Sequence, residues 1–291
     1  MLVGMAAGAA KALPIKVDHA SVCGSQLERL RDAFAMVGLA TDYGGPHAHG
    51  GTQMALLGFD DGSYLELIAP QKAGGKMDSD WGRMIEGDAG PCAWATGSQH
   101  LQEDLARFKQ AGLPVEGPSP GSRKRPDGQV IEWETGTAGS GAPGSTLPFL
   151  IQDKTPRQLR VLPSASVHGS GLSGIAVVVL GVKNLEAASE QFQKAYGWQA
   201  PEIENHAEFG ARLAYFAGSP VVLAAPLGEH SWLEERLRTF GESPVAYLLG
   251  TKNLAAAKAR YTLSGDRQWF HRKIAWFDAK KLNGIRLGVI E

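Results

Sequence analysis

The sequence predicts an α+β fold of four βαβββ modules, paired into two domains with curled mixed sheets and external helices. Three observations predict it. A pattern of strand, helix and hairpin recurs four times, beginning near residues 17, 91, 174 and 244. The repeat period is therefore roughly 70 to 80 residues. One such unit exposes an apolar sheet face that it cannot bury alone, so the units are expected to pair.

The first module is the clearest. It is expected to form a strand at 15–22, a helix at 25–37, and a hairpin of strands at 54–59 and 63–68. Ser25 is a suitable N-cap and Gly38 a suitable stop for the helix. The apolar residues between them recur at helical spacing. An Asp-Gly turn at Asp61 joins the two hairpin strands.

The other modules repeat this order. The second is expected to have strands at 91–95, 129–134 and 147–151 and a helix that starts at Ser98. The third is expected to have strands at 174–180, 212–216 and 221–225 and a helix at 184–197. The fourth is expected to have strands at 244–249, 274–278 and 285–290 and a helix at 253–261. Trp81 and Trp232 each precede a short stretch from Gly to Pro before modules two and four.

The repeat also divides the chain into halves. Residues 1–163 are expected to form a first domain from modules one and two, and residues 172–291 a second domain from modules three and four. The segment 164–171 between them is rich in Ser and Gly, which is typical of a linker. The Gly-rich stretch 136–145 lies inside module two and is expected to be a loop.

Composition and charge narrow the class of protein. The net charge of −1 and the pI near 6.7 provide no basic surface for nucleic acid or anionic membrane. No apolar run approaches the ~18 residues of a membrane span, and no secretory signal is expected. The two cysteines, Cys23 and Cys92, form neither a disulfide framework nor a CxxC pair, which predicts a reducing, cytoplasmic setting.

Two strands of the first module carry metal-capable side chains among apolar or small neighbours. His19 lies in the strand at 15–22 and Glu66 in the strand at 63–68. A carboxylate buried in a strand needs a partner or a metal, because an uncompensated charge is costly in a medium of low dielectric. If the two strands are neighbours, the imidazole and the carboxylate can converge. The alternative for each residue is a hydrogen-bonded structural role.

The motifs of the first half resemble those of glyoxalase-like domain proteins in the vicinal oxygen chelate superfamily, which includes glyoxalase I, extradiol dioxygenases and bleomycin-resistance proteins. The matching segments are Asp18-His19, Gly44-Gly45-Pro46-His47, Gly51-Thr52, the run from Asp61 to Ile68, Arg125-Pro126-Asp127-Gly128 with Trp133, and Pro148-Phe149-Leu150-Ile151. The resemblance covers about residues 15 to 155.

The resemblance implies a cup that holds a divalent metal, which a substrate with vicinal oxygens chelates. His19 and Glu66 occupy the expected ligand positions, and Glu66 is the expected catalytic carboxylate. His47 matches the family's Gly-Gly-x-His position, while His49 pairs with His206 when the hairpins are aligned. His47 and His49 are therefore both candidate ligands. Such a set would suit Fe, Mn, Ni, Co or Zn, and the ligand types do not choose among them.

The other modules lack the pair. Aligned by their loops, Cys92 and Leu150, give or take one residue, replace His19 and Glu66 in module two, and Gly174 and Val222 replace them in module three. Module four has Ala246 or its neighbours and apolar residues. The second half is therefore expected to have lost its ligands.

These observations support two functions. The first is a metal-dependent lyase, isomerase or dioxygenase that acts on a small molecule with vicinal oxygens, with Trp94, Trp133 and Phe149 as apolar walls of its site. The second is a protein of the same fold that binds or sequesters a small molecule without turnover. For each aromatic residue the alternative is a place in the ordinary core.

Overall fold

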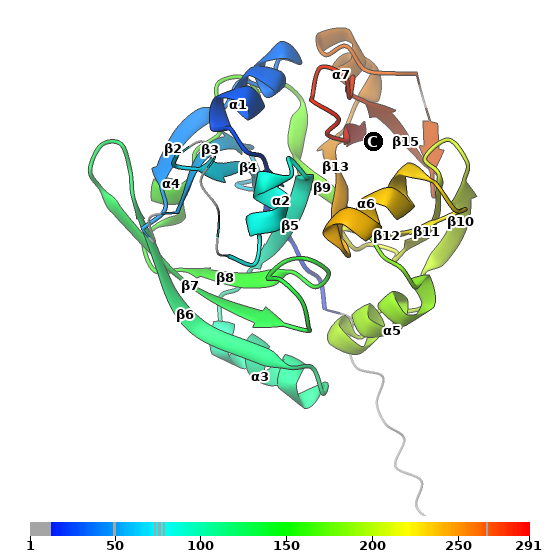
Figure 1. Cartoon of the computed structure of the whole chain (residues 1–291), viewed down its shortest axis with the longest axis horizontal. Helices are drawn as coiled ribbons and strands as arrows, with labels where there is room; N and C mark the ends of the chain where they lie inside the picture. The colour runs from blue at the N-terminus through cyan, green and yellow to red at the C-terminus, as the bar shows by residue number, and fades with distance from the viewer. Residues whose placement is uncertain (1–12, 49–50, 73, 75–76, 78, 266) are drawn as a thin grey trace, which may run out of the picture.

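The computed structural model describes residues 13–48, 51–72, 74, 77, 79–265 and 267–291, and it consists of two eight-stranded sheets with helices outside them (Figure 1). The strand order is β2-β3-β4-β1-β5-β8-β7-β6 in the first sheet and β10-β11-β12-β9-β13-β16-β15-β14 in the second. Each sheet joins two modules, so the predicted α+β class and the pairing of modules are confirmed.

The first sheet joins modules one and two through an antiparallel contact between β1 and β5. Within each module the first and last strands run parallel, β1 with β4 and β5 with β8. The strands are β1 (Val17–Cys23), β2 (Asp42–Pro46), β3 (Thr52–Gly58), β4 (Tyr64–Pro70), β5 (Gly90–Gly97), β6 (Val115–Lys124), β7 (Val130–Ala138) and β8 (Phe149–Asp153); the helices are α1 (Leu27–Met36), α2 (Gly82–Glu86), α3 (Leu101–Gln110) and α4 (Arg157–Arg160).

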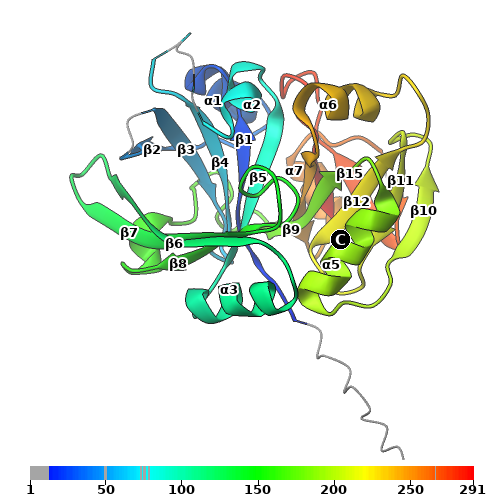
Figure 2. The same cartoon turned by 60° about the horizontal axis from the view of Figure 1, so that its bottom comes forward.

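The second sheet repeats this plan, with β9 and β13 as its central antiparallel pair. Its strands are β9 (Leu172–Gly181), β10 (Glu202–His206), β11 (Ala211–Tyr215), β12 (Val221–Pro226), β13 (Ser243–Thr251), β14 (Arg267–Trp269), β15 (Arg272–Trp276) and β16 (Leu287–Ile290); its helices are α5 (Leu185–Tyr196), α6 (Trp232–Phe240) and α7 (Leu254–Arg260). In Figure 2, α3 lies below the first sheet and α5 covers the second.

Each module contains one strand that was not predicted from the sequence. The second strands, β2, β6, β10 and β14, were not predicted, and they lie at the outer edges of the sheets. The connecting helices α2, α4 and α6 were not predicted either. The Trp-to-Pro stretches before modules two and four contain α2 and α6, each followed closely by the first strand of its module.

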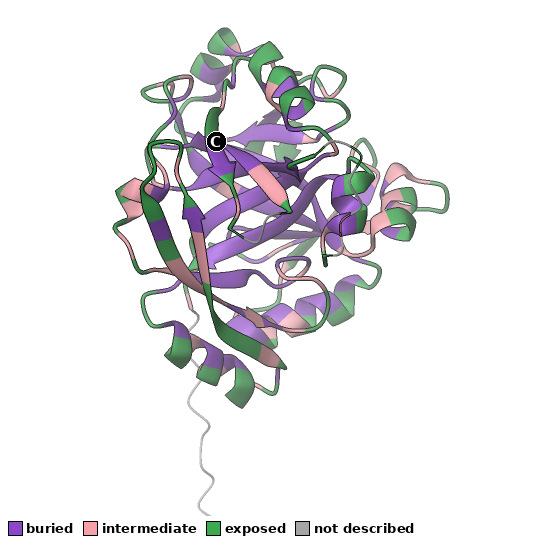
Figure 3. Cartoon of the chain, turned by 60° about the vertical axis from the view of Figure 1, so that its left-hand side comes forward, coloured by how far each residue is buried: buried purple, intermediate pink, exposed green. Residues whose placement is uncertain are grey.

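The outer faces of both sheets share one apolar core. It contains residues of α1, α3 and α5 together with the central strands of both sheets, for example Phe34, Phe108, Phe192 and Leu249. The buried strands at the centre of the molecule stand out in Figure 3. The division at 163 and 172 stays a prediction, and within the segment 164–171 Ser164 and Val167 are buried.

The inner face of the first sheet is the face turned away from this shared core. Its apolar residues form separate clusters, which include Met54, Leu56 and Tyr64 in one and Ala95, Phe149 and Ile151 in another. The two edge strands of the first sheet approach each other because His47, directly after β2, forms a bridge with Arg123 of β6. This bridge nearly closes the curled sheet around its inner face.

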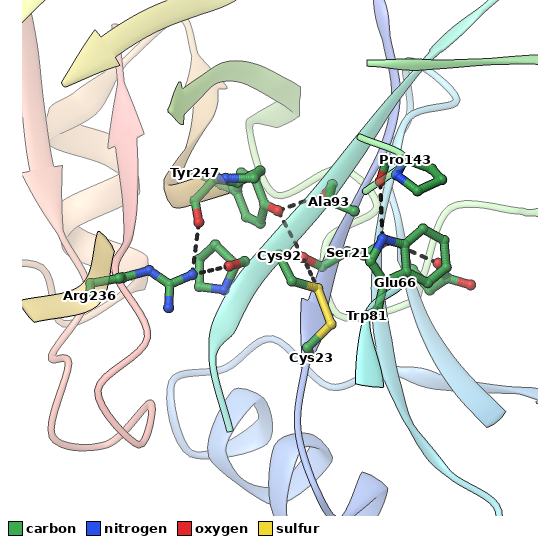
Figure 4. The surroundings of a disulfide bond; sticks show 11 residues. Ser21, Cys23, Glu66, Trp81, Cys92, Ala93, Pro143, Arg236 and Tyr247 are labelled. Atoms are coloured by element: carbon green, nitrogen blue, oxygen red, sulfur yellow. Dashed lines mark hydrogen bonds between the residues drawn. A yellow bond between two sulfur atoms is a disulfide. The ribbon is translucent and has the colours of Figure 1, made fainter. Parts of the chain in front are cut away.

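The interpretation of the cysteines was wrong. Cys23 of β1 and Cys92 of β5 form a disulfide, with their Cα atoms 5.9 Å apart (Figure 4). The two residues are 69 positions apart and come together because β1 and β5 are neighbours. The bond links the first strands of modules one and two. None of the helices within the described ranges has the length and apolar character that a membrane crossing requires.

Candidate functional site

The strand register brings His19 and Glu66 to the same face of the first sheet. In the parallel pair of β1 and β4, His19 is opposite Tyr64 and Ser21 is opposite Glu66. Side chains at alternate positions of a strand share a face, so all four residues lie on the inner face. His19 and Glu66 are diagonal neighbours there. The predicted convergence on adjacent strands is therefore seen.

His19 is fixed on three sides. Its Nδ1 atom lies 2.6 Å from Oδ1 of Asp18. Its ring stacks on Tyr64 with centroids 4.8 Å apart, and the ring of Phe149 meets it edge-on at 5.3 Å. Only 4% of His19 is exposed. The imidazole is thus held in one orientation by a carboxylate and two aromatic rings.

Asp18 is itself held by two arginines from α4. Arg160 makes a bidentate contact, with Nη1 2.9 Å from Oδ1 and Nη2 2.9 Å from Oδ2. Arg157 donates to Oδ2 as well. Burial alone would raise the pKa of Asp18, but the hydrogen bond to His19 and the charge of Arg160 outweigh it and lower the pKa below its ordinary value. Asp18 is therefore an ionised, acceptor-only carboxylate.

This network determines the tautomer of His19. An ionised carboxylate can only accept a hydrogen bond, so Nδ1 of His19 must carry the proton that it donates to Asp18. In the neutral imidazole Nε2 then has a free lone pair. Among the described residues Nε2 has no hydrogen-bond partner. His19 is thus prepared either to accept a proton or to bind a metal ion through Nε2.

Glu66 is buried and accepts two contacts. Its Oε2 accepts a hydrogen bond from Oγ of Ser21 at 3.1 Å, and its Oε1 lies 3.3 Å from Nε2 of His47. Burial alone would raise the pKa of Glu66, but His47 first, and then His19 and Ser21, lower it to about 2. A carboxylate with so low a pKa is a weak base, and its fixed negative charge suits it to bind or stabilise a positive group.

His47 is fixed between Glu66 and the closing bridge of the sheet. Its Nδ1 lies 2.7 Å from Oγ1 of Thr52. Its bridge partner Arg123 is 5% exposed and donates to the backbone oxygens of Gly44 and Arg160, each at 2.5 Å. Burial lowers the pKa of Arg123. Arg123 thus ties β6 to β2 and α4.

The predicted aromatic walls have different positions. Phe149 and Trp133 pack in one inner-face cluster, and Trp81, which precedes α2, joins them with its ring 6.3 Å from that of Phe149. Trp94 lies in the core shared by the two sheets, with Nε1 donating to the backbone oxygen of Thr146 at 2.9 Å. His49 lies outside the described residues.

Two cavities adjoin the site. One, of about 390 Å³, is lined by Asp18, Arg157 and the inner-face residue Ile151. The other, of about 500 Å³, is lined by Arg123, Arg160 and the inner-face residue Leu56. His19 and Glu66 line neither cavity.

The described donors do not form a metal cage. Both oxygens of Glu66 and both nitrogens of His47 already have protein partners. Within the described ranges no three His, Cys, Asp or Glu side chains are grouped so that they could hold a metal ion. The donor types would suit a divalent cation, but this arrangement does not fit one. We therefore derive no chemical step through a metal, and the metal site stays a prediction.

Equivalent positions in the other modules are found from the hydrogen bond that ends each parallel pair. Gly24 N–H donates to the oxygen of Ile68, Ser98 N–H to that of Ile151, and Val182 N–H to that of Ala224. Counting back from these bonds, Ala93 and Phe149 replace His19 and Glu66 in module two, and Val177 and Val222 replace them in module three. The loop-based alignment was wrong in placing Cys92 and Gly174 opposite His19. Neither of these two modules has a His/Glu pair.

The comparisons agree with this architecture. A model of the glyoxalase-like domain matches residues 17–196, more than half of the chain. The chain belongs to the glyoxalase-like domain family. A sequence comparison with curated proteins gave no match.

Two solved structures that match nearly the whole chain support the fold of this glyoxalase-like protein. A hypothetical protein from Staphylococcus aureus has a TM-score of 0.62 at 14% identity, with 94% of this chain and 98% of that chain covered. A mutant of 4-hydroxymandelate synthase from Streptomyces coelicolor has a TM-score of 0.63 at 14% identity, with 95% and 92% covered. Streptomyces coelicolor methylmalonyl-CoA epimerase matches at 22% identity over 41% of this chain and 96% of its own, with a TM-score of 0.36.

The arginines of the site were not found by sequence reasoning. Arg123, Arg157 and Arg160 reach Asp18 and His47 from β6 and α4, more than seventy positions away along the chain. No local pattern marks them. Asp18 did carry a signal, because an acidic residue inside an otherwise apolar strand needs a partner.

Proposed function

We propose that this glyoxalase-like protein is an enzyme that transfers a proton on a small molecule with vicinal oxygens, at the inner face of the first sheet. The observation that carries the proposal is the Asp18–His19 contact of 2.6 Å, which leaves Nε2 of His19 as a proton acceptor on the same face as Glu66. The substrate class, a molecule with vicinal oxygens, is inferred from the glyoxalase-like family. The reaction type, proton transfer, is inferred from the side chains of the site.

Each side chain has a distinct part. His19 Nε2 takes a proton from the carbon next to a carbonyl, and Asp18 stabilises the imidazolium that forms. His19 then returns a proton to the same or another atom of the substrate, so protons balance over the cycle and no oxidant is needed. In D₂O the proton held on Nε2 exchanges for deuterium before it is returned. Glu66 stays ionised and places a fixed negative charge on the face of the sheet where the imidazolium forms. Phe149 and Trp133 provide an apolar surface for the rest of the ligand.

The experiment follows the exchange of carbon-bound protons. Hydroxyacetone and glycolaldehyde, incubated with the protein in D₂O, should lose their α-proton signals in ¹H NMR faster than in buffer. His19→Ala should abolish this acceleration. His168→Ala is a matched control, because His168 is exposed and pairs with Asp60 on the β3–β4 turn, and neither residue contacts His19. Exchange that His19→Ala leaves at the wild-type rate would contradict the proposal.

A second function is favoured because the polar groups of the site are already paired with one another and are buried. Glu66 and His47 already satisfy each other, and His19 and Glu66 are 4% and 7% exposed. Such a site suits a protein that binds or sequesters a small molecule without turnover. The same NMR titration separates the two functions: ligand-induced shifts of the Trp133 indole signal without proton exchange would support binding alone.

A further inference from the structure

A cavity of about 390 Å³ lies where the two halves of the chain meet, and neither His19 nor Glu66 lines it. Ala89 and Pro91 line it from the first half, and Trp232, Arg236 and Phe240 of α6 line it from the second. Arg286, just before β16, completes the wall. Its volume is within the range of small-molecule sites.

Two guanidinium groups face this cavity without a counter-anion. Arg236 donates through Nη2 to the backbone oxygens of Pro91 and Pro244, the latter at 2.9 Å (Figure 4). Its Nε is buried and has no hydrogen-bond partner. Arg286 lies over the ring of Trp232, 3.7 Å from the centroid. In the part of the chain that the structure describes, neither arginine forms an ion pair.

This arrangement is electrostatically unfavourable while the cavity holds no anion. Burial lowers the pKa of Arg236 to about 10, and the like charge of Arg286 contributes to the lowering. Burial also lowers the pKa of Arg286. Glu235 is the one carboxylate among the residues that line the cavity, and it is exposed and bonded to neither arginine. Two partly buried cations that repel each other without a partner are unfavourable, and an anion between them would offset that repulsion.

We infer that this cavity binds a phosphomonoester, with the phosphate between Arg236 and Arg286. A phosphate dianion matches two guanidinium charges, and the planar fork of arginine suits its oxygens. Nη1 of Arg236 makes none of the hydrogen bonds of the described residues and is not among the buried unpaired atoms, so it is the donor available to the phosphate. The apolar remainder of the ligand packs against Phe240 and Trp232, because the cavity is larger than a phosphate group requires. This site is independent of the function proposed for His19.

The test is a calorimetric titration of the full chain with phenyl phosphate at low ionic strength. Wild-type protein should bind phenyl phosphate, and Arg286→Met should weaken binding at least tenfold. Arg238→Met is the matched control, because Arg238 is an exposed arginine of the same helix and does not line the cavity. It should leave the affinity within a factor of two. Added salt should weaken binding.

A second pair of variants keeps the test independent of folding defects. Thr239 is exposed and lines the cavity, so Thr239→Glu places a negative charge at its rim, and Thr239→Gln is the neutral control. Thr239→Glu should weaken phenyl phosphate several-fold more than Thr239→Gln does. Wild-type protein that fails to bind phenyl phosphate at millimolar concentration would overturn the inference. Equal affinity in Arg286→Met, or tighter binding of benzoate, would do so too.

Discussion

Nδ1 of His19 lies 2.6 Å from Oδ1 of Asp18, and this contact determines which imidazole nitrogen is available for chemistry. Because the carboxylate is ionised, it fixes the proton on Nδ1 and directs the lone pair of Nε2 to the inner face. A base and a metal ligand need the same tautomer. The contact is therefore a common requirement of proton transfer and of metal binding by His19.

Asp18→Asn should reverse this tautomer. The asparagine amide can donate to Nδ1, so Nε2 would then carry the proton and lose its lone pair. We expect the ¹⁵N spectrum of His19 to change from the Nδ1–H to the Nε2–H form, with stability reduced by about 1–3 kcal/mol. Asp61→Asn is a control, because it replaces an aspartate on the β3–β4 turn and should leave the His19 spectrum unchanged. An unchanged tautomer in Asp18→Asn would show that Asp18 does not set it.

Arg160→Met should destabilise the fold strongly. Arg160 is 3% exposed and pairs with both Asp18 and Asp153, so its removal leaves two carboxylates without their main cation. Breaking a buried pair by removing one partner costs about 3–5 kcal/mol. Arg157→Met is the matched variant on the same helix, and its cost should be smaller because its side chain is 26% exposed. Urea unfolding measures both, and equal losses would contradict a special part for Arg160.

The predictable part of this fold is the part that is buried. The strands at 15–22, 63–68, 174–180 and 244–249 were expected because they are short segments rich in apolar residues, and they became the buried centres of the sheets. The missed strands have the opposite character. In β6, Val115–Lys124 contains two prolines and two glycines and is largely exposed. Edge strands gain their structure from one neighbour and bury little, so they leave no apolar pattern.

The site residues divide in the same way: those within buried strands were predicted from the sequence, and their partners from distant segments were not. His19 and Glu66 were identified because a polar residue stands out in an apolar strand. Their partners could not be identified, because the Arg160–Asp18 contact joins residues 142 positions apart and depends on how α4 folds back. The Cys23–Cys92 bond was missed for a similar reason, since it requires the β1–β5 pairing. The alignment that made Cys92 equivalent to His19 relied on loops, whereas the hydrogen bonds that end the parallel strand pairs make Ala93 the equivalent residue.

Metal analysis tests the predicted ligands directly. If His19, Glu66 and the loop that carries His47 and His49 bind a divalent ion, protein purified without chelator should contain stoichiometric metal. His19→Ala and Glu66→Ala should each lose it, because two ligands of a small set cannot be replaced by water without a large loss of affinity. Elemental analysis by mass spectrometry provides the measurement, with His168→Ala as the control. Metal retained in both variants would place the ion elsewhere.

Removing the disulfide should lower stability without changing the inner face. The bond joins residues 69 positions apart, and a disulfide typically stabilises a fold by about 2–4 kcal/mol through the unfolded chain. Cys23→Ala with Cys92→Ala should therefore unfold at lower urea concentration than oxidised wild type. Reduced wild-type protein should resemble the double variant. Wild-type protein that is equally stable with and without reductant would argue that the bond is not formed in solution.

The depressed pKa of Glu66 predicts how stability depends on pH. The pKa is lowered from 4.5 to about 2 on folding, so the ionised carboxylate stabilises the fold fully above pH 4.5. That contribution is lost as the pH falls from 4.5 towards 2, because protons then bind the unfolded chain more tightly. Its size is on the order of 3 kcal/mol. Urea unfolding at a series of pH values should show the free energies of unfolding of wild type and Glu66→Gln converging as the pH falls from 4.5 towards 2.

The exposed Glu28 provides the control for this experiment, since its side chain is 73% exposed and its partner Arg31 lies on the same helix. The free energy of unfolding of Glu28→Gln should follow that of wild type with a constant difference at every pH. If the free energy of unfolding of Glu66→Gln also differs from that of wild type by a constant amount at every pH, Glu66 is not held ionised by His47 in the folded protein. Ser21→Ala should have an intermediate effect, because it removes the weaker of the two contacts that favour the charged carboxylate. A variant at His47 should have the larger effect, since His47 is the strongest of the groups that lower this pKa.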